Sequence, residues 1–309
     1  MIYSIENETY RVSVKSEGAE LCSFYDKTAD HEYIWEGDPA FWTGTSPLLF
    51  PIVGRLRDDI YHLNGKEYHM PKHGFAKKME FEVETKSDDE LVFLLRDTEE
   101  TRVGFPYAFE LRVRYAFVNH GFVMEFSVKN VNDETMYFSL GAHPAFAIAL
   151  GDKVVLDEAE TLAAFKLDEN FLRGKVQQPV FDNARELVIT AETFAKDALI
   201  FDGIKSKGAS VIRANGKNVH VAFDAPCLGI WAKPAAPYVC IEPWHGIDDM
   251  CDAGHEIAEK ERIEVLGAGE TWVFPVTITA IDRSNFIKRY CHRVVNARHS
   301  SVHHQVMQG

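Results

Sequence analysis

The chain has 309 residues, of which 46% are hydrophobic and 26% charged, a composition typical of an ordinary soluble globular protein. Its formal net charge of −14 argues against nucleic acid or an anionic membrane as the main partner, because both would repel it. A neutral or weakly charged small molecule fits this composition more easily.

The N-terminus lacks the basic and apolar segments that direct secretion, and no apolar run approaches membrane-spanning length. Five cysteines are scattered without CxxC spacing, which favours neither a disulfide framework nor a zinc site. We therefore expect a cytoplasmic protein that needs no metal or other cofactor. Monomer and homodimer are both compatible with the sequence.

Alternation of apolar and polar residues predicts strands along most of the chain. It occurs at residues 10–14, 20–24, 91–95, 109–117, 122–128, 136–140, 197–201, 209–212, 219–223, 263–266 and 271–278. The dipeptides Asn64-Gly65 and Asn215-Gly216 predict tight hairpins within this pattern. Residues 151–196 lose the alternation, so we expect polar loops there, with a short helix around 191–195.

No repeat, linker or low-complexity tract divides the chain. Because strands outnumber plausible helices, the sequence predicts one large all-β, antiparallel sandwich domain over residues 1–282. Residues 283–309 lose the alternation and are expected to form a short helix or a disordered tail.

Glu242 is the first candidate for chemistry. It follows an apolar run and precedes Pro243, which is expected to end the strand because proline cannot donate to a sheet ladder. A carboxylate with apolar neighbours has a displaced protonation equilibrium, which suits proton transfer. A strand-terminal glutamate held by a lysine or arginine explains the pattern equally well.

Two histidines adjoin predicted strand ends. His143 follows small residues and precedes Pro144, so its ring is expected at the rim of a sheet, where it could act as a general acid or base. The alternative is a rim histidine bonded to a backbone carbonyl. His73 precedes Gly74 in an irregular loop and could face a ligand or be a plain surface residue.

Three further residues are candidates for ligand binding. Arg55 follows a buried run and Gly54, which allows a close approach, so we expect it to point inward; the alternative is a solvated arginine. Asp197 could face the site or cap a turn. Trp231 offers a flat apolar face on which a sugar ring could stack, or it could fill the core.

Four segments together resemble the aldose 1-epimerases, the galactose mutarotase-like family, and in particular their LacX-like branch. These segments are Pro51-Ile52-Val53-Gly54-Arg55-Leu56, Pro71-Lys72-His73-Gly74-Phe75, Leu140-Gly141-Ala142-His143-Pro144-Ala145-Phe146 and Ile241-Glu242-Pro243-Trp244. The resemblance extends from the N-terminus to about residue 281. It implies a large antiparallel β-supersandwich and an isomerase that interconverts the α and β anomers of an aldose.

The resemblance also implies a role for individual residues. Glu242 matches the base that takes the proton from the C1 hydroxyl, and His143 matches the acid that protonates the ring oxygen. Arg55 and His73 match residues that hold the substrate, and Asp197 is the best match to a sugar-binding aspartate. Gly54 stands where family members usually have asparagine, which leaves the sugar open. Arg57 or Lys233 could favour a phosphorylated or acidic sugar.

Three other functions remain as alternatives. A non-catalytic carbohydrate-binding protein would keep the aromatic residues and Arg55 without needing both Glu242 and His143. A glycoside hydrolase needs two facing carboxylates, and only Glu242 has a suitable setting. A cupin-like metal enzyme could use His73, His143 and Glu242, although these lack the close histidine spacing of such sites.

Overall fold

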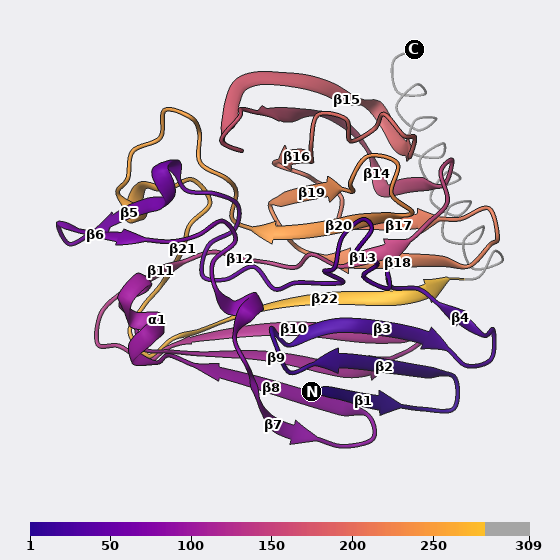
Figure 1. Ribbon diagram of the computed structural model, residues 1–309, viewed down its shortest axis with the longest axis horizontal. Helices are drawn as coiled ribbons and strands as arrows, with labels where there is room; N and C mark the ends of the chain where they lie inside the picture. Colours follow the sequence, from indigo (N-terminus) through magenta and orange to yellow (C-terminus); the bar gives the residue numbers. More distant parts are fainter. Residues whose placement is uncertain (282–309) are drawn as a thin grey trace, which may run out of the picture.

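The computed structural model describes residues 1–281 and consists almost entirely of antiparallel strands (Figure 1). Its largest element is a nine-stranded sheet of order β15-β14-β17-β18-β22-β10-β9-β8-β7. The strands are β7 (Glu82–Lys86), β8 (Glu90–Arg96), β9 (Phe109–Val118), β10 (Gly121–Asn130), β14 (Lys153–Leu167), β15 (Arg173–Val188), β17 (Gly208–Ile212), β18 (Asn218–Phe223) and β22 (Thr271–Ile281).

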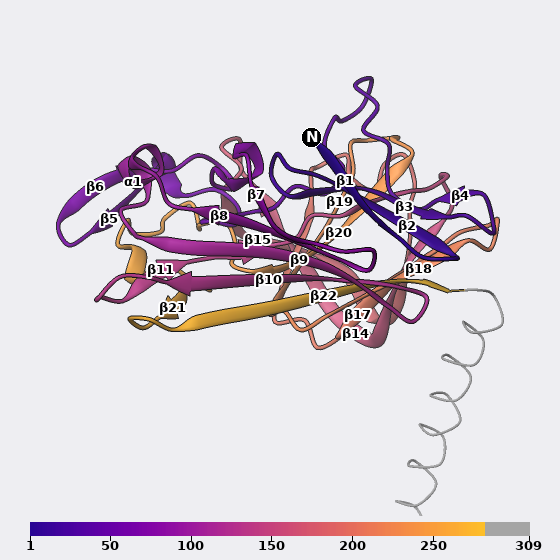
Figure 2. The ribbon, with the colours of Figure 1, turned by 90° about the horizontal axis from the view of Figure 1, so that it is seen from below.

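A four-stranded sheet covers one half of the nine-stranded sheet, and Figure 2 shows β1–β3 above β10 and β22. Its strands are β1 (Ile2–Glu6), β2 (Tyr10–Lys15), β3 (Glu20–Asp26) and β4 (His31–Glu32). The rings of Phe24 and Phe122 meet across these layers with centroids 5.1 Å apart. Burial of such aromatic pairs holds the two sheets together.

A five-stranded sheet lies beside the other half, in the order β12-β20-β19-β16, with β13 also paired to β20. Its strands are β12 (Leu140–Gly141), β13 (Ala145–Ala147), β16 (Leu199–Asp202), β19 (Cys227–Trp231) and β20 (Tyr238–His245). Phe181 of β15 and Phe201 of β16 pack with ring centroids 5.6 Å apart. The expected all-β antiparallel sandwich is thereby confirmed.

The remaining elements are short. The Asn64-Gly65 hairpin is confirmed as β5 (Ile60–Leu63) and β6 (Lys66–His69), which project at one end of the molecule (Figure 1). The other short elements are β11 (Met136–Phe138), β21 (Glu264–Leu266), α1 (Glu99–Gly104) and the 3-10 turns η1 (Arg57–Asp59), η2 (Ala76–Lys78) and η3 (Ile257–Glu259).

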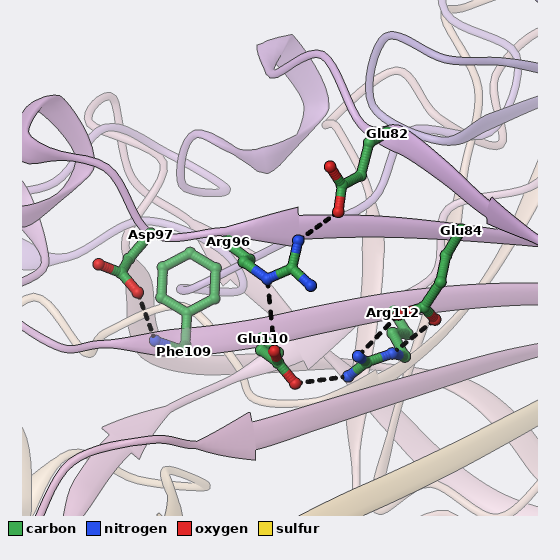
Figure 3. Close-up of polar contacts among 7 residues, drawn as sticks. All are labelled: Glu82, Glu84, Arg96, Asp97, Phe109, Glu110 and Arg112. Atoms are coloured by element: carbon green, nitrogen blue, oxygen red, sulfur yellow. Dashed lines mark hydrogen bonds and ion pairs between the residues drawn. The ribbon is translucent and has the colours of Figure 1, made fainter.

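An ion-pair ladder stabilises the exposed face of β7–β9 (Figure 3). Arg112 binds Glu84 through two hydrogen bonds of 2.8 Å and Glu110 through a third of 2.8 Å. Arg96 extends the ladder to Glu82 and Glu110. Arg112 lowers the pKa values of the Glu84 and Glu110 carboxyls by donating these bonds to them.

The expectation of loops and a helix at residues 151–196 is wrong. This segment forms β14 and β15, the two longest strands, and residues 191–197 form turns. The β14–β15 pairing contains several register shifts, and only two residues of β15 are buried. Bulges and exposure both break the alternation of buried and exposed side chains, so the sequence pattern disappears although the strands remain.

Pro243 does not end its strand, contrary to expectation, because β20 continues to His245. The Pro243 carbonyl accepts a hydrogen bond from the Ala142 N–H at 3.1 Å, on the side where β12 gives way to β13. The missing N–H of the proline therefore falls at an interruption in the neighbouring strand. No ladder bond is lost there, which lets proline occupy an interior strand.

The predicted boundary at residue 282 and the predicted tail at 283–309 lie outside the described residues. Within residues 1–281 no helix has the length and apolar character needed to cross a membrane.

Candidate active site

A cavity of ≈ 500 Å³ opens at the five-stranded sheet and brings together five of the six predicted site residues. Its lining includes His73, His143, Asp197, Trp231 and Glu242. The turn between β14 and β15 contributes Phe171 to the wall, so the two strands that the sequence pattern missed help to build the site. A cavity of this volume is typical of small-molecule sites.

Glu242 and His143 face each other across neighbouring segments of the sheet. The Ile241 N–H donates to the Pro144 carbonyl at 3.1 Å, and the bond from Ala142 to Pro243 lies on the other side of the pair. These bonds set Glu242 opposite His143, and side chains opposite each other on adjacent strands are in contact. The distance from His143 Nε2 to Glu242 Oε2 is 3.1 Å.

Burial controls the protonation of this pair. It raises the pKa of the Glu242 carboxyl well above its usual value and lowers the pKa of His143 to about 3, because both charged forms lose hydration. Burial therefore favours a neutral carboxylic acid beside a neutral imidazole. One proton is held between two groups within hydrogen-bonding distance, which suits acid–base chemistry.

His73 is fixed in one tautomer by a neighbouring loop. The Gly54 backbone N–H donates to His73 Nδ1 at 3.0 Å, and the His73 backbone N–H donates to the Gly54 carbonyl at 2.8 Å. Burial holds the pKa of His73 well below its usual value, so the ring is neutral. Because Nδ1 accepts a hydrogen bond, the proton of the neutral ring resides on Nε2, which is left as a donor.

Aromatic rings line the cavity beside the pair. Trp231 packs edge-to-face against His143, with centroids 5.8 Å apart, and against Trp42, with centroids 5.3 Å apart. Trp42 itself lies over His143 at 5.1 Å. Trp231 therefore both lines the cavity and packs on the core, so the two alternatives for this residue, a face for a sugar ring and a core filler, are compatible.

Asp197 lies at the cavity, just before β16. Its Oδ1 accepts a hydrogen bond of 2.7 Å from the N–H of Ala198, and no ion pair within the described part of the chain neutralises it. Its backbone has a positive φ of 79°, a conformation that residues other than glycine rarely adopt. The carboxylate is thus available as a hydrogen-bond acceptor for a ligand.

Arg55 does not line the cavity, in contrast to the inward orientation expected. Its guanidinium pairs with Asp59, with Nη2 2.6 Å from Oδ2, and its side chain is 30% exposed. The Arg55 N–H donates to Asp248 Oδ1 at 2.8 Å, and Asp248 does line the cavity. Arg55 therefore reaches the site only through its backbone.

The close approach expected at Gly54 is confirmed. A Cβ at this position would lie 2.6 Å from the backbone N and Cα of Asp248, and φ is +74°. Glycine is required here because any side chain would collide with the Asp248 backbone and strain its own. The contact holds the Gly54 loop against the segment that follows β20.

Three lysines that the sequence analysis did not single out also line the cavity: Lys72, Lys77 and Lys78. Lys72 Nζ lies over the ring of Phe171, 4.5 Å from its centroid. Arg57 and Lys233, the cations considered from sequence, are not in the lining. Lys72 directly precedes His73 in the sequence, and this adjacency could have identified Lys72 as a further site residue.

His143, Cys240 and Glu242 are the one group in the described residues whose ligand atoms could converge on a metal, with all three atoms within 4.8 Å of one another. Burial raises the pKa of the Cys240 thiol and of the Glu242 carboxyl. Divalent metals bind thiolate and carboxylate, so burial of the protonated forms opposes binding. The donor set fits proton transfer better than a metal.

Comparison with known proteins agrees with this architecture. The family model described as aldose 1-epimerase matches residues 1–279. The chromosomal protein LacX of Lactococcus lactis subsp. lactis is 32% identical over 281 residues, covering 85% of this chain and 94% of LacX.

Solved structures show the same fold. The galactose mutarotase related enzyme from Lactobacillus acidophilus is 34% identical with a TM-score of 0.86, covering 91% of this chain and 98% of its own. A galactose mutarotase-like protein from Lactobacillus casei ATCC 334 is 26% identical, also with a TM-score of 0.86, covering 91% of this chain and 100% of its own. The family match over nearly the whole described chain and the relatives above 30% identity lead to one conclusion: the chain belongs to the aldose 1-epimerase family.

Proposed function

We propose that this protein is an aldose 1-epimerase that interconverts the α and β anomers of a hexose or related sugar. The observation that carries the proposal is the buried contact of 3.1 Å between His143 and Glu242 at a cavity of sugar-binding size. Family membership supports the same reaction. Anomer exchange needs one proton removed from the sugar and one returned, and this pair can do both.

The reaction begins from the ionised form of the pair, in which the Glu242 proton has moved to His143 across the 3.1 Å contact. Glu242, as the carboxylate, then takes the proton of the C1 hydroxyl. His143, as the imidazolium, donates a proton to the ring oxygen, the C1–O5 bond breaks and an open-chain aldehyde forms. Rotation about C1–C2 turns the other face of the aldehyde toward O5. Ring closure then reverses both proton transfers and gives the other anomer.

The protons balance within the pair. Ring opening leaves Glu242 protonated and His143 neutral, which is the resting form that burial favours. Ring closure consumes that form and regenerates the carboxylate and the imidazolium. The two forms differ by one proton moved across the contact between Nε2 and Oε2, so no proton from solvent is needed.

Three residues would hold the sugar in this proposal. His73 donates from Nε2, Asp197 accepts from a hydroxyl group, and Trp231 provides an apolar face against the ring. Arg55 would act as a positioning residue, because its backbone N–H orients Asp248 while its side chain stays with Asp59.

The test is α/β exchange of glucose and galactose, followed by magnetisation-transfer NMR. Wild-type protein is expected to accelerate exchange, whereas Glu242→Gln and His143→Gln remove the acceleration. Glu264→Gln is a matched control, because Glu264 Oε1 lies 2.9 Å from His245 Nδ1 in a Glu–His pair outside the cavity. Saturable sugar binding without acceleration would instead identify a non-catalytic carbohydrate-binding protein.

A further inference from the structure

The three cavity lysines form a group that we call the lysine cluster: Lys72, Lys77 and Lys78. They belong to one short segment that ends in η2, and all three line the cavity that holds Glu242 and His143. Lys72 and Lys77 are half-buried, and Lys78 is exposed. The cluster therefore reaches from the interior of the cavity to its mouth.

No carboxylate neutralises the cluster. Among the described residues, no ion pair involves any of the three lysines, and Lys77 Nζ donates instead to the Lys72 carbonyl at 3.1 Å. Lys260, whose side chain is 4% exposed, shows the usual arrangement, because its Nζ lies 2.6 Å from Asp249 Oδ1. Three unpaired cations beside one cavity are unexpected in a chain whose net charge is −14.

The acids that line the same cavity do not offset this charge. Glu20 is engaged by Lys15 and by the backbone of Thr45 and Ser46. Burial raises the pKa of Glu242 well above its usual value, which disfavours the charged form of this carboxyl. Asp248 is buried, which raises its pKa, and its Oδ1 accepts a hydrogen bond from the Arg55 backbone N–H at 2.8 Å. Asp197 is the remaining lining acid, and we assign it to the sugar, so the lysine side of the cavity is positive.

The lysines also repel one another. Burial, followed by the charges of Lys78 and Lys72, lowers the pKa of Lys77 to about 8. An anion placed among the three ammonium groups would remove this repulsion and use their free donors. Lysine binds phosphate as a point charge with three donors, and it pairs with carboxylate in the same way.

We propose that the lysine cluster binds an anionic substituent of the sugar, a phosphate or a carboxylate carried on a carbon other than C1. This rests on the proposed function, because the anomeric carbon must lie at Glu242 and His143 with its hydroxyl free. Because the lysine cluster and the Glu242–His143 pair line the same cavity, a sugar with C1 at the pair would place its charged group at the lysines. The substrate class is an acidic or phosphorylated aldose.

Equilibrium binding tests the proposal without relying on turnover. Isothermal titration would compare glucose, glucose 6-phosphate and glucuronate, and the galactose counterparts of all three, on wild-type protein. The anionic sugars are expected to bind about tenfold or more tightly than the neutral ones, since charge-assisted hydrogen bonds are among the strongest polar contacts. Preference for phosphate over carboxylate, or the reverse, identifies which anion the site takes.

The double variant Lys77→Gln/Lys78→Gln should lose most of the preference for anionic sugars. Lys78→Gln alone should lose part of that preference, and because Lys78 is exposed this substitution does not threaten folding. Lys233→Gln is the matched control, because Lys233 is exposed and outside the cavity lining, so it should keep the full preference. Circular dichroism and urea unfolding would verify that each variant is folded.

Two results would overturn the proposal: anionic sugars that bind no more tightly than neutral ones, or a preference that survives in the double variant. Either can be told apart from failure of the proposed function. If the preference for anionic sugars depends on the lysines but anomer exchange is not accelerated, the epimerase proposal is rejected and the anion site is supported. If anomer exchange is accelerated but anionic sugars bind no more tightly than neutral ones, the epimerase proposal is supported and the anion site is rejected.

Discussion

His143 Nε2 lies 3.1 Å from Glu242 Oε2, and the two side chains are only 10% and 2% exposed. Two residues far apart in the sequence are thus brought within 3.1 Å of each other inside the protein. Their pKa values move in opposite directions because each loses the hydration of its charged form.

Anomer exchange should stay level between roughly pH 5 and 7, where an ordinary histidine titrates near 6.5. The reason is that burial lowers the pKa of His143 to about 3 and raises that of Glu242, so the pair keeps one proton throughout this range. Exchange rates measured across these values, extrapolated to zero buffer, provide the test. A drop in rate centred near pH 6.5 would contradict it.

Glu242→Gln should become progressively more stable than wild type as the pH rises from 5 to 7. The carboxyl ionises above pH 4.5 in the unfolded chain but stays protonated in the fold, so the native state binds more protons and wild-type stability falls with rising pH. The difference should grow by up to about 1.4 kcal/mol per pH unit. Urea unfolding at several pH values measures it, and a constant difference would show that the Glu242 pKa is not raised.

Gly54→Ala should destabilise the protein by about 2–4 kcal/mol and reduce exchange, because its Cβ would meet the Asp248 backbone at 2.6 Å and φ is +74°. The same loop fixes the tautomer of His73. Gly216→Ala is the control for backbone strain alone, since Gly216 has φ of +77° with nothing within 4 Å of a Cβ. It should cost about 1 kcal/mol and leave exchange intact. Equal losses in both variants would rule out the steric argument.

Arg112→Met should lower stability by about 1 kcal/mol at pH 7, because the ladder in Figure 3 is partly exposed and loses its central cation. Arg112 lowers the pKa values of Glu84 and Glu110, so its contribution is present above pH 4.5 and disappears as the pH falls through their folded pKa values. Unfolding at pH 7 and pH 3 should therefore show a smaller loss at pH 3 than at pH 7. Arg11→Met, which removes a cation over Tyr25 without breaking an ion pair, serves as the comparison.

Chelating agents should not change the exchange rate, and Cys240→Ala should retain exchange within a few-fold. Both follow if His143, Cys240 and Glu242 act as a protonated cluster and not as metal ligands. Dialysis against EDTA followed by rate measurement, with metal content checked before and after, is sufficient. Loss of activity that returns with added zinc would assign the cluster to a metal.

Particular elements show what the sequence could predict about the fold. The Asn64-Gly65 hairpin and the alternating strands β9 and β10 were predictable because turn chemistry and period-two burial are local properties. β14 and β15 were not, because their register shifts and exposure erase the alternation. The continuation of β20 through Pro243 was also hidden, since it depends on an interruption in a neighbouring strand.

The sequence by itself determined the all-β class, the family and the residue types available for proton transfer at Glu242 and His143, since each rests on local pattern and motif. Only the tertiary structure decided which side chains share the cavity. It placed Glu242 against His143, paired the Arg55 side chain with Asp59 and positioned the lysine cluster at the cavity. The physical reason is that contact between distant segments depends on strand register and loop packing, which the whole fold sets and no single segment encodes.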